Sequence, residues 1–541
     1  MSVLPTIPAA PSTSTPPVAA WAPLRHPVFR MLWGVSLAAN SSMWMNDVAA
    51  AWLMTSLTTS PVMVALVQSA STLPVFLLGI PSGALADILD RRRYFMVTQI
   101  WVAVVALLVS AVVALDAITA PLLLVLTFAN GVGLAMRWPV FAAIVPELVP
   151  QRELPAALGL NSIAMNGARV IGPILAGTII ASAGSAWVFA LNAALSVAAA
   201  FVIFLWRREQ KTSALPGERF VGAMRVGVQH VAQSRRMRAV LLHLALFFLQ
   251  TTSLLALLPL VAKGMRGGGA STYTLLFASM GGGAIVAALY QQRLRAKIPR
   301  DRIVTGATLL FAVAMLVVAT APNATIAAAA MAAAGAAWIS VANLLMVTAQ
   351  LGLPDWVRAR GMSICQMAVM GSSAAGAALW GQVASWTDVR TSLGCAAAAL
   401  LAGLLVSRRV PVDTGQHVDL TPAHFSLPPE AEIDIDPRAG PVLITIEYWI
   451  DPARAPDFLE VMQASRRDRL RHGVLSWALF RDAADPARYI EHFLNESWVD
   501  HLRHLEHMTA FDLELRARRL AFHIDEKPPK VRRSIGQSLD H

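Results

Sequence analysis

The chain has 541 residues, of which 56% are hydrophobic and only 14% are charged, with a formal net charge of +11 at pH 7. Soluble domains carry about 25% charged residues, so this composition excludes an ordinary soluble enzyme. Residues 1–411 hold 28 Lys and Arg against 11 Asp and Glu, and residues 412–541 hold 16 against 22. Because the excess of positive charge belongs to the apolar part of the chain, we expect no nucleic-acid partner.

The first 27 residues are rich in Pro, Ser, Thr and Ala. They lack the basic segment followed by an apolar core that marks a secretory signal peptide. We therefore expect residues 1–27 to form a disordered cytoplasmic leader.

Long apolar runs follow one another between residues 28 and 407. Each is about 20 residues long, enough to cross roughly 30 Å of hydrocarbon as a helix. They predict an all-α membrane part with twelve transmembrane helices, divided into an N-terminal six-helix bundle (28–206) and a C-terminal six-helix bundle (239–410). The predicted spans are 28–52, 61–86, 94–115, 119–144, 156–182, 185–206, 239–262, 273–291, 302–320, 324–349, 359–384 and 389–407.

Basic residues concentrate in every second connector of this arrangement. The opposite connectors contain only Lys263, Arg266 and Arg390. Since basic loops stay on the cytoplasmic side, the asymmetry predicts a multi-pass protein of the bacterial inner (plasma) membrane with both termini in the cytoplasm. The loop 207–238 mixes arginines with apolar residues at helical spacing. It fits either an amphipathic helix on the inner membrane surface or a plain basic tether.

Two bundles of six helices enclose a cavity near the middle of the membrane when they are built as repeats. Three charged residues, Asp47, Arg137 and Arg169, fall inside predicted spans. Such residues face a cavity or pair with one another. A buried Asp47 can bind and release a proton, which predicts protons as a partner, although a structural ion pair fits it too. Further cavity candidates are Asn40, Asn46, Gln68, Asn130 and Asn166, with weaker support for Asn161, Gln250 and Gln366.

Between the second and third spans the sequence runs GALADILDRRR over residues 83–93. This loop resembles the signature of the major facilitator superfamily at the same place. The resemblance implies two six-helix bundles with alternating access, and a gating charge relay with a neighbouring helix. The alternative is that the arginines only set the topology. The sequence departs from the signature at Ile88 and Asp90. The matching residues are Gly83, Leu85, Asp87, Arg91 and Arg92.

The fifth span contains NGARVIGPILAG over residues 166–177. Small residues four apart let helices pack closely, and the proline bends the helix. The segment resembles the fifth-helix motif of the superfamily's antiporters, with Ala168, Gly172, Pro173 and Gly177 in its positions. The resemblance implies export driven by proton entry, and ordinary tight packing is the alternative.

A narrower resemblance covers about residues 24–410. It rests on segments such as Asp47 with 49–53, Trp138-Pro139 and 145–150. Together they look like the branch of enterobactin exporters and macrolide-efflux pumps. This implies a secondary transporter that exports a small organic compound: a siderophore, a drug or a secondary metabolite. The resemblance does not identify which of these is the substrate. Two alternatives stay open: a proton-coupled importer, and a membrane-tethered protein whose C-terminal domain modifies or senses the compound.

After residue 410 the composition changes to a Pro- and Asp-rich linker (411–440), followed by a small α+β domain (441–525). Alternating apolar residues from 442 to 450 predict a strand. A helix (452–470), two strands (474–481 and 488–495) and a last helix (498–521) complete a β-α-β-β-α order with one bare sheet face. Residues 526–541 are predicted to be a basic disordered tail.

This domain resembles the ferredoxin-like domains of the antibiotic-biosynthesis-monooxygenase type, which pair into a dimeric α+β barrel. The resemblance implies a homodimer through this domain, and catalysis by it stays open. His501, His504 and His507 follow one another at helical spacing, which fits a proton or metal site or a solvated helix face. No nucleotide fingerprint or metal-ligand spacing appears, so we expect no cofactor, no metal and no ATP-driven transport.

Overall fold

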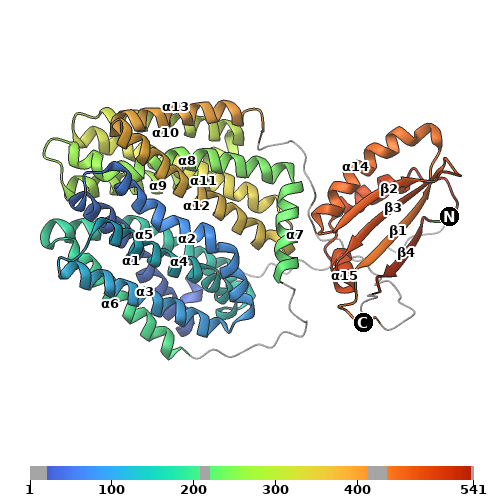
Figure 1. Cartoon of the computed structure of the whole chain (residues 1–541), viewed down its shortest axis with the longest axis horizontal. Coiled ribbons are helices and arrows are strands. Elements are labelled where there is room, and N and C mark those ends of the chain that lie inside the picture. The colour runs from blue at the N-terminus through green and yellow to red at the C-terminus, as the bar shows by residue number, and fades with distance from the viewer. Residues whose placement is uncertain (1–20, 207–219, 412–418, 420, 422–434, 538–541) are drawn as a thin grey trace.

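The computed structural model describes residues 21–206, 220–411, 419, 421 and 435–537. Within these ranges, long helices fill the first three quarters of the chain and a small sheet domain follows (Figure 1). The first set of long helices is α1 (Pro27–Leu57), α2 (Pro61–Ile88), α3 (Arg91–Ala114), α4 (Ala120–Leu148), α5 (Leu154–Ala183) and α6 (Ser185–Leu205). The second set is α8 (Arg235–Gly264), α9 (Ala270–Lys297), α10 (Arg300–Thr320), α11 (Ala324–Leu351), α12 (Asp355–Trp386) and α13 (Val389–Ser407).

Local sequence explains where several of these helices begin. Side chains of Asp90, Ser234, Asn323 and Asp388 accept hydrogen bonds from the first backbone N–H groups of α3, α8, α11 and α13. Such caps satisfy donors that have no partner inside the helix. Helices α1, α2, α4 and α5 have proline in the first turn, where its missing N–H costs nothing.

The two sets of helices form two packed halves. In the first half α1 packs against α5 and α6, and α2 against α4; in the second half α9 and α10 pack against α11, and α8 against α12 and α13. The halves meet where α2 contacts α12 and where α5 contacts α9. Hydrogen bonds also cross this boundary, from Ser69 Oγ to the carbonyl of Ala374 at 2.7 Å and from Lys263 Nζ to the carbonyl of Thr55 at 2.6 Å.

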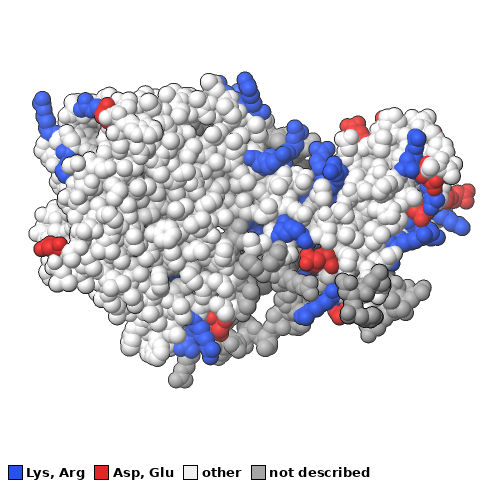
Figure 2. Space-filling model, in the orientation of Figure 1, with Lys and Arg blue, Asp and Glu red and all other residues white. Residues whose placement is uncertain are grey.

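Within the described residues, eleven helices are long and apolar enough to cross a membrane. Helix α1 is not among them, because Arg30, Asp47 and several Ser and Asn residues lower its mean hydropathy, although its 31 residues span more than a bilayer core. The twelfth span therefore stays a prediction. The charged side chains in view gather at the ends of the helical part and on the sheet domain, and leave an uncharged belt between (Figure 2).

Helix α7 (Phe220–Gln233) lies between the halves in sequence, inside the loop predicted to be amphipathic. It contacts α12 and the C-terminal helix α14 (Ala455–Arg471), so one side of it is covered by protein. Val228 on another side is half exposed. Helix α7 thus joins the helical part to the sheet domain (Figure 1).

The C-terminal domain is a four-stranded antiparallel sheet of order β2-β3-β1-β4. Its strands are β1 (Val442–Trp449), β2 (Ser476–Arg481), β3 (Arg488–Asn495) and β4 (Lys530–Ile535), and its helices are α14, α15 (Trp498–Glu506) and α16 (Ala510–Leu520).

Two features of this domain differ from the sequence prediction. The expected single last helix is split into α15 and α16, because Thr509 caps α16 in a reciprocal capping box with Asp512. The expected disordered tail contains β4, which pairs with β1 from Val442 opposite Ile535 to Glu447 opposite Lys530. This strand is mostly exposed and basic, as is typical of protected sheet edges, and so lacks the alternating pattern of a buried strand.

Candidate functional site

A cavity of about 300 Å³ lies between the two halves of the helical part. Both halves supply its walls, through α1, α2, α4 and α5 on one side and α8, α9, α11 and α12 on the other. Most lining side chains are apolar or aromatic. The polar and charged ones are Asp47, Gln68, Ser71, Thr72, Arg169, Thr252, Asn343, Gln366 and Ser373.

Asp47 supplies a carboxylate to this cavity from the middle of α1. Its Oδ1 accepts a hydrogen bond from Ser71 Oγ on α2 at 3.3 Å. Tyr273 and Gln68 line the same space. An ionisable side chain that faces a cavity between membrane helices is a candidate for a proton or substrate site.

Arg169 supplies a guanidinium group to the same cavity from α5. Its central carbon lies 4.7 Å from the ring centroid of Trp338 and 5.4 Å from that of Trp44. These rings come from opposite halves, so cation–π contacts hold the arginine between them. Its Nε and Nη1 atoms are buried and have no hydrogen-bond partner among the described residues. The arrangement presents N–H donors to an acceptor in the cavity.

Four other predicted cavity residues, Asn40, Asn46, Asn130 and Arg137, are not among those that line this cavity. Asn46 and Asn130 line a void of about 10 Å³ inside the first half, where Asn192 Nδ2 donates to Asn46 Oδ1 at 3.1 Å. Asn40 donates to Ser36 Oγ at 3.3 Å. Arg137 is buried on α4 and is not among the residues that line the larger cavity. The side chain of Asn166 lies outside the described residues.

The sequence analysis did not include two aromatic cavity residues, since aromatic side chains in membrane spans more often serve packing or anchor the helix at the membrane interface. Trp338 and Tyr273 line the cavity, and Trp338 also contacts Arg169. A pair of tryptophans, one in each half, around a lone arginine was the signal that could have found them. Asn343, a polar residue in the tenth predicted span, was also available as a candidate.

The small residues of the fifth-helix motif lie where α5 contacts its neighbours. Ala168 and Ala176 are fully buried. A Cβ on Gly172 would lie 2.7 Å from Cβ of Trp44 on α1, and one on Gly177 would overlap the side chain of Thr274 on α9. Gly177 therefore permits the close approach of α5 and α9, which joins the two halves. Pro173 lies inside the helix between these two contacts.

Of the predicted gating loop, the side chains of Gly83, Asp87 and Arg91 lie outside the described part of the structure. Arg92 donates from Nη2 to the carbonyl of Phe204 at the end of α6, at 2.8 Å. Asp90, which departs from the family signature, accepts from the backbone N–H of Arg93 at 2.8 Å and so caps α3.

The C-terminal domain has a buried charge network between its sheet and helices. Glu491 is fully buried on β3 and accepts hydrogen bonds from Tyr448 Oη and Trp477 Nε1, both at 2.9 Å. Its Oε1 also lies 3.4 Å from Arg469 Nε and 3.8 Å from Arg519 Nη1. Burial alone would raise the pKa of Glu491, but the two guanidinium groups hold it below its usual value.

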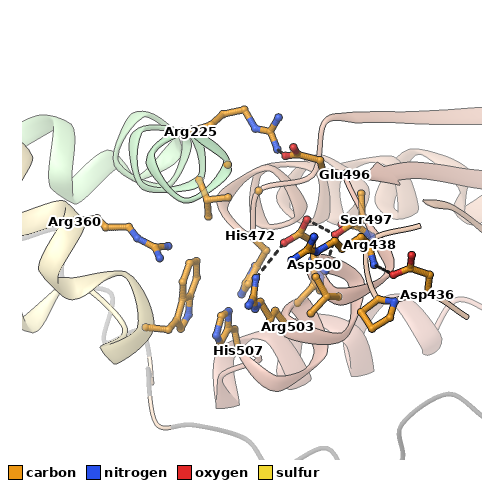
Figure 3. A pocket seen from close by; sticks show the side chains of 18 residues that line it. Arg225, Arg360, Asp436, Arg438, His472, Glu496, Ser497, Asp500, Arg503 and His507 are labelled. Atoms are coloured by element: carbon orange, nitrogen blue, oxygen red, sulfur yellow. Dashed lines mark hydrogen bonds and ion pairs between the residues drawn. The ribbon is translucent and has the colours of Figure 1, made fainter. Parts of the chain in front are cut away.

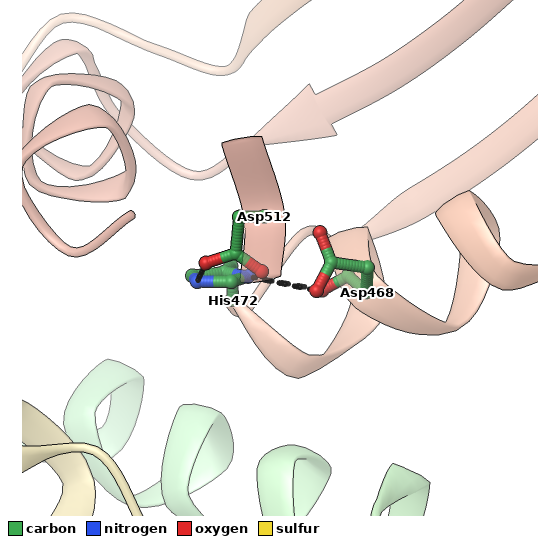
Figure 4. Close-up of side chains that lie close together, drawn as sticks. All are labelled: Asp468, His472 and Asp512. Atoms are coloured by element: carbon green, nitrogen blue, oxygen red, sulfur yellow. Dashed lines mark hydrogen bonds and ion pairs between the residues drawn. The ribbon is translucent and has the colours of Figure 1, made fainter. Parts of the chain in front are cut away.

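A second buried group joins α14 to α16 (Figure 4). His472 Nε2 lies 3.5 Å from Asp512 Oδ2, and His472 Nδ1 lies 3.9 Å from Asp468 Oδ1. Burial lowers the pKa of His472, but the hydrogen bond to Asp512 and the two carboxylate charges together raise it to about 9. Burial raises the pKa of Asp468 to about 6, while Asp512, despite its burial, has its pKa lowered by His472. The group is an internal ion pair with a protonated imidazole.

The three histidines predicted on one helix face have different surroundings. His501 and His504 are buried, and burial lowers the pKa of His501 to about 4 and that of His504 well below its usual value. His507 stacks on Trp356 at the start of α12, with 4.6 Å between ring centroids. Of the three, His507 contacts the helical part, whereas His501 and His504 contact Arg533 and Arg469 of the C-terminal domain itself. The sequence did not indicate Trp356 as the partner of His507.

Comparison with known proteins places the chain in a family. The sequence profile of the transmembrane secretion effectors, a family of major facilitator transporters, matches residues 18–539. The chain belongs to this family. The match extends through the C-terminal domain, and this multi-pass membrane transporter carries that domain within the matched region.

Two curated transporters match parts of the chain. The uncharacterized MFS-type transporter YfiS of Bacillus subtilis is 30% identical over 150 residues, which are 28% of this chain and 35% of that protein. The staphyloferrin A transporter of Staphylococcus aureus is 27% identical over 139 residues, 26% of this chain and 35% of that protein. The chain thus spans about a third of the length of these relatives.

Solved transporters share the fold. A bacterial homologue of the human lysosomal transporter Spinster, in an inward-facing and unoccupied conformation, is 14% identical with a TM-score of 0.58, covering 72% of this chain and 98% of that one. A POT family transporter in complex with 5-aminolevulinic acid is 13% identical with a TM-score of 0.59, covering 72% and 97%. At such identities the likeness shows the major facilitator fold alone.

Proposed function

We propose that the protein exports a small organic anion, such as a carboxylate-bearing siderophore, drug or secondary metabolite, in exchange for protons. The solute enters the cavity between the halves, and alternating access releases it on the other side of the bacterial inner membrane. Both termini and the C-terminal domain lie in the cytoplasm. The observation that carries the proposal is that Arg169 and Asp47 line the same cavity.

Each of the two charges has one part in this cycle. Arg169 has buried N–H groups without partners, so it recognises an acidic group of the solute. Asp47 takes a proton from the outer side after the solute has left, and loses it to the cytoplasm when the solute enters. The aromatic and apolar walls hold the organic part of the solute.

The direction of transport draws support from the family and from one relative. The family is described as a secretion effector family. One relative is named as a transporter of staphyloferrin A. The antiporter-like small residues at Ala168, Gly172 and Gly177 lie at helix contacts where such a motif acts by close packing. The gate that the loop residues Asp87, Arg91 and Arg92 provide is part of the same proposal.

The test uses inside-out membrane vesicles with an imposed proton gradient. Cells with and without the protein are first screened against toxic compounds and secreted chelators to find a solute. We expect wild-type vesicles to accumulate that solute, Asp47→Asn to abolish the dependence on the gradient, and Arg169→Gln to raise the KM for anionic solutes at least tenfold. Asp116→Asn, an exposed loop acid, is the matched control.

Two results would contradict the proposal. If the Asp47→Asn variant still accumulates the solute in response to the proton gradient, Asp47 is not the coupling site. Accumulation in right-side-out vesicles, with the gradient directed inward, makes the protein an importer instead.

A second candidate function is favoured by the buried network around Glu491. Buried groups of this kind mark sites of chemistry as well as structure. In this candidate the C-terminal domain modifies or senses the solute. Deleting residues 412–541 separates the two: an exporter keeps residual transport, whereas a tethered enzyme loses its product.

A further inference from the structure

A second cavity, of about 370 Å³, lies between the C-terminal domain and the helical part. Its walls come from α7, from the start of α12 and from the loop and helix ends of the C-terminal domain around α14 and α15. Figure 3 shows charged side chains of both parts converging on it. It is separate from the cavity that contains Asp47 and Arg169.

The indole ring of Trp356 connects the two walls of this cavity, the helical part and the C-terminal domain. Trp356 at the start of α12 stacks on His507 with ring planes 1° apart, and on His472 with 5.6 Å between centroids. His230 of α7 meets its edge at 5.5 Å, and His230 Nδ1 lies 3.3 Å from the carbonyl of Arg471. These contacts fix the C-terminal domain against α7 and α12, so the cavity between them is a built site.

The charges that line the cavity have an excess of positive sign. Four arginines face three acids, and the charge of His472 is already balanced by Asp468 and Asp512 behind it. Two of the acids already have cationic partners: Glu496 Oε2 lies 2.6 Å from Arg225 Nη2, and Asp500 Oδ1 lies 3.6 Å from Arg503 Nη1. Arg360 and Arg438 also line the cavity. A cavity of this kind attracts anions.

His504 provides an unused donor in the wall of this cavity. It is 4% exposed, and Arg469 Nη1 lies 3.1 Å from its Nε2. Because a guanidinium group can only donate, Nε2 accepts this hydrogen bond and the ring proton of the neutral imidazole sits on Nδ1. Nδ1 is buried and has no partner among the described residues. A buried N–H of this kind calls for an acceptor from a ligand.

We propose that this cavity is a binding site for a small oxoanion, a carboxylate or a phosphate group, which accepts from His504 Nδ1–H and pairs with the arginines that line it. Carboxylate and phosphate oxygens are the acceptors that guanidinium groups bind best. Helix α12 lines this cavity with Trp356 and the central cavity with Gln366 and Met370. A bound oxoanion therefore ties the C-terminal domain to a helix of the transport pathway.

The experiment is titration calorimetry on the full-length chain in detergent at pH 7.5, with citrate and, separately, inorganic phosphate. We expect saturable binding of at least one of them to the wild type. Arg503→Gln and His504→Phe are each expected to weaken that binding at least tenfold. The matched control is Arg390→Gln at the start of α13, at the other end of the helical part, which leaves the affinity unchanged.

A variant of the central cavity separates this inference from the transport function. Arg169→Gln is expected to keep the calorimetric binding while it impairs transport, so the two proposals can fail independently. Citrate binding alone assigns the site to carboxylates, and phosphate binding alone assigns it to phosphates. The inference is overturned if neither anion binds, if Arg503→Gln binds as the wild type does, or if only Arg169→Gln loses binding. Arg503→Gln keeps the test decisive if His504→Phe fails to fold.

Discussion

Loss of the proton from His472 is expected to make the C-terminal domain less stable in alkaline solution. The imidazole is buried between Asp468 and Asp512, with the neutral ring of His504 beside it and Arg471 as a neighbouring positive group. Its pKa is raised to about 9, against 6.5 for an unperturbed histidine. A pKa that is higher in the folded state contributes stability that is complete below the unfolded value and is lost as the pH rises through the folded value.

The size of this effect follows from the two pKa values. Above pH 7.5 the unfolded imidazole is almost fully neutral, whereas the folded one loses its proton only around pH 9. Since one pKa unit corresponds to about 1.4 kcal/mol, the free energy of opening of this domain should fall by about 2 kcal/mol between pH 7.5 and pH 9.5. The low pKa values of His230 and His501, which are about 4, place their effects on stability at acid pH, outside this window.

Native-state hydrogen exchange of α14 and α16 in the full-length chain measures this free energy, after correction for the intrinsic exchange rate at each pH. His472→Gln should be less stable at pH 7.5 and should show no fall between the two values. His492→Gln, on the other side of the sheet, is the control and should keep the fall. Equal stability of the wild type at both pH values would refute the assignment of a protonated His472.

Three further predictions concern contacts described above. Gly177→Ala should strain the α5–α9 contact against Thr274 and lower both transport and thermal stability, while Gly167→Ala, whose Cβ meets nothing within 4 Å, should change neither. Glu491→Gln leaves two buried arginines without their carboxylate, and should lower the stability of the C-terminal domain by about 3–5 kcal/mol in chemical denaturation. Trp356→Ala removes the ring between the two walls, so limited proteolysis should release the C-terminal domain faster than from the wild type; equal rates would contradict this docking contact.

The helical part could be predicted because a long apolar run of about 20 residues can cross a membrane in few ways other than as a helix. The runs of about 20 apolar residues predict long helices, and eleven helices in the described part of the chain are long and apolar enough to cross a membrane. Charge within a span was the best guide to the cavity, since the structure places Asp47 and Arg169 there. Asparagines were a poorer guide to the cavity, because Asn46 accepts a hydrogen bond from Asn192 inside the first half instead of facing the cavity.

The contacts between the two parts of the chain could not be predicted in the same way. Trp356 and His507 are 151 positions apart, and no pattern in the sequence around either residue predicts that they are in contact. His472 is four residues from Asp468, but its second partner Asp512 lies on another helix. The edge strand Lys530–Ile535 carries three basic residues and resembles a solvated tail until its pairing with β1 is known.

The position of Arg169 between Trp44 and Trp338 has an optical consequence. Trp44 belongs to the first half and Trp338 to the second. A movement of one half relative to the other must therefore separate the Arg169 guanidinium group from at least one of the two rings. Tryptophan emission is sensitive to a nearby guanidinium group. The intrinsic fluorescence of the protein should therefore change during the transport cycle. Conformational exchange could be followed in real time without attaching a dye.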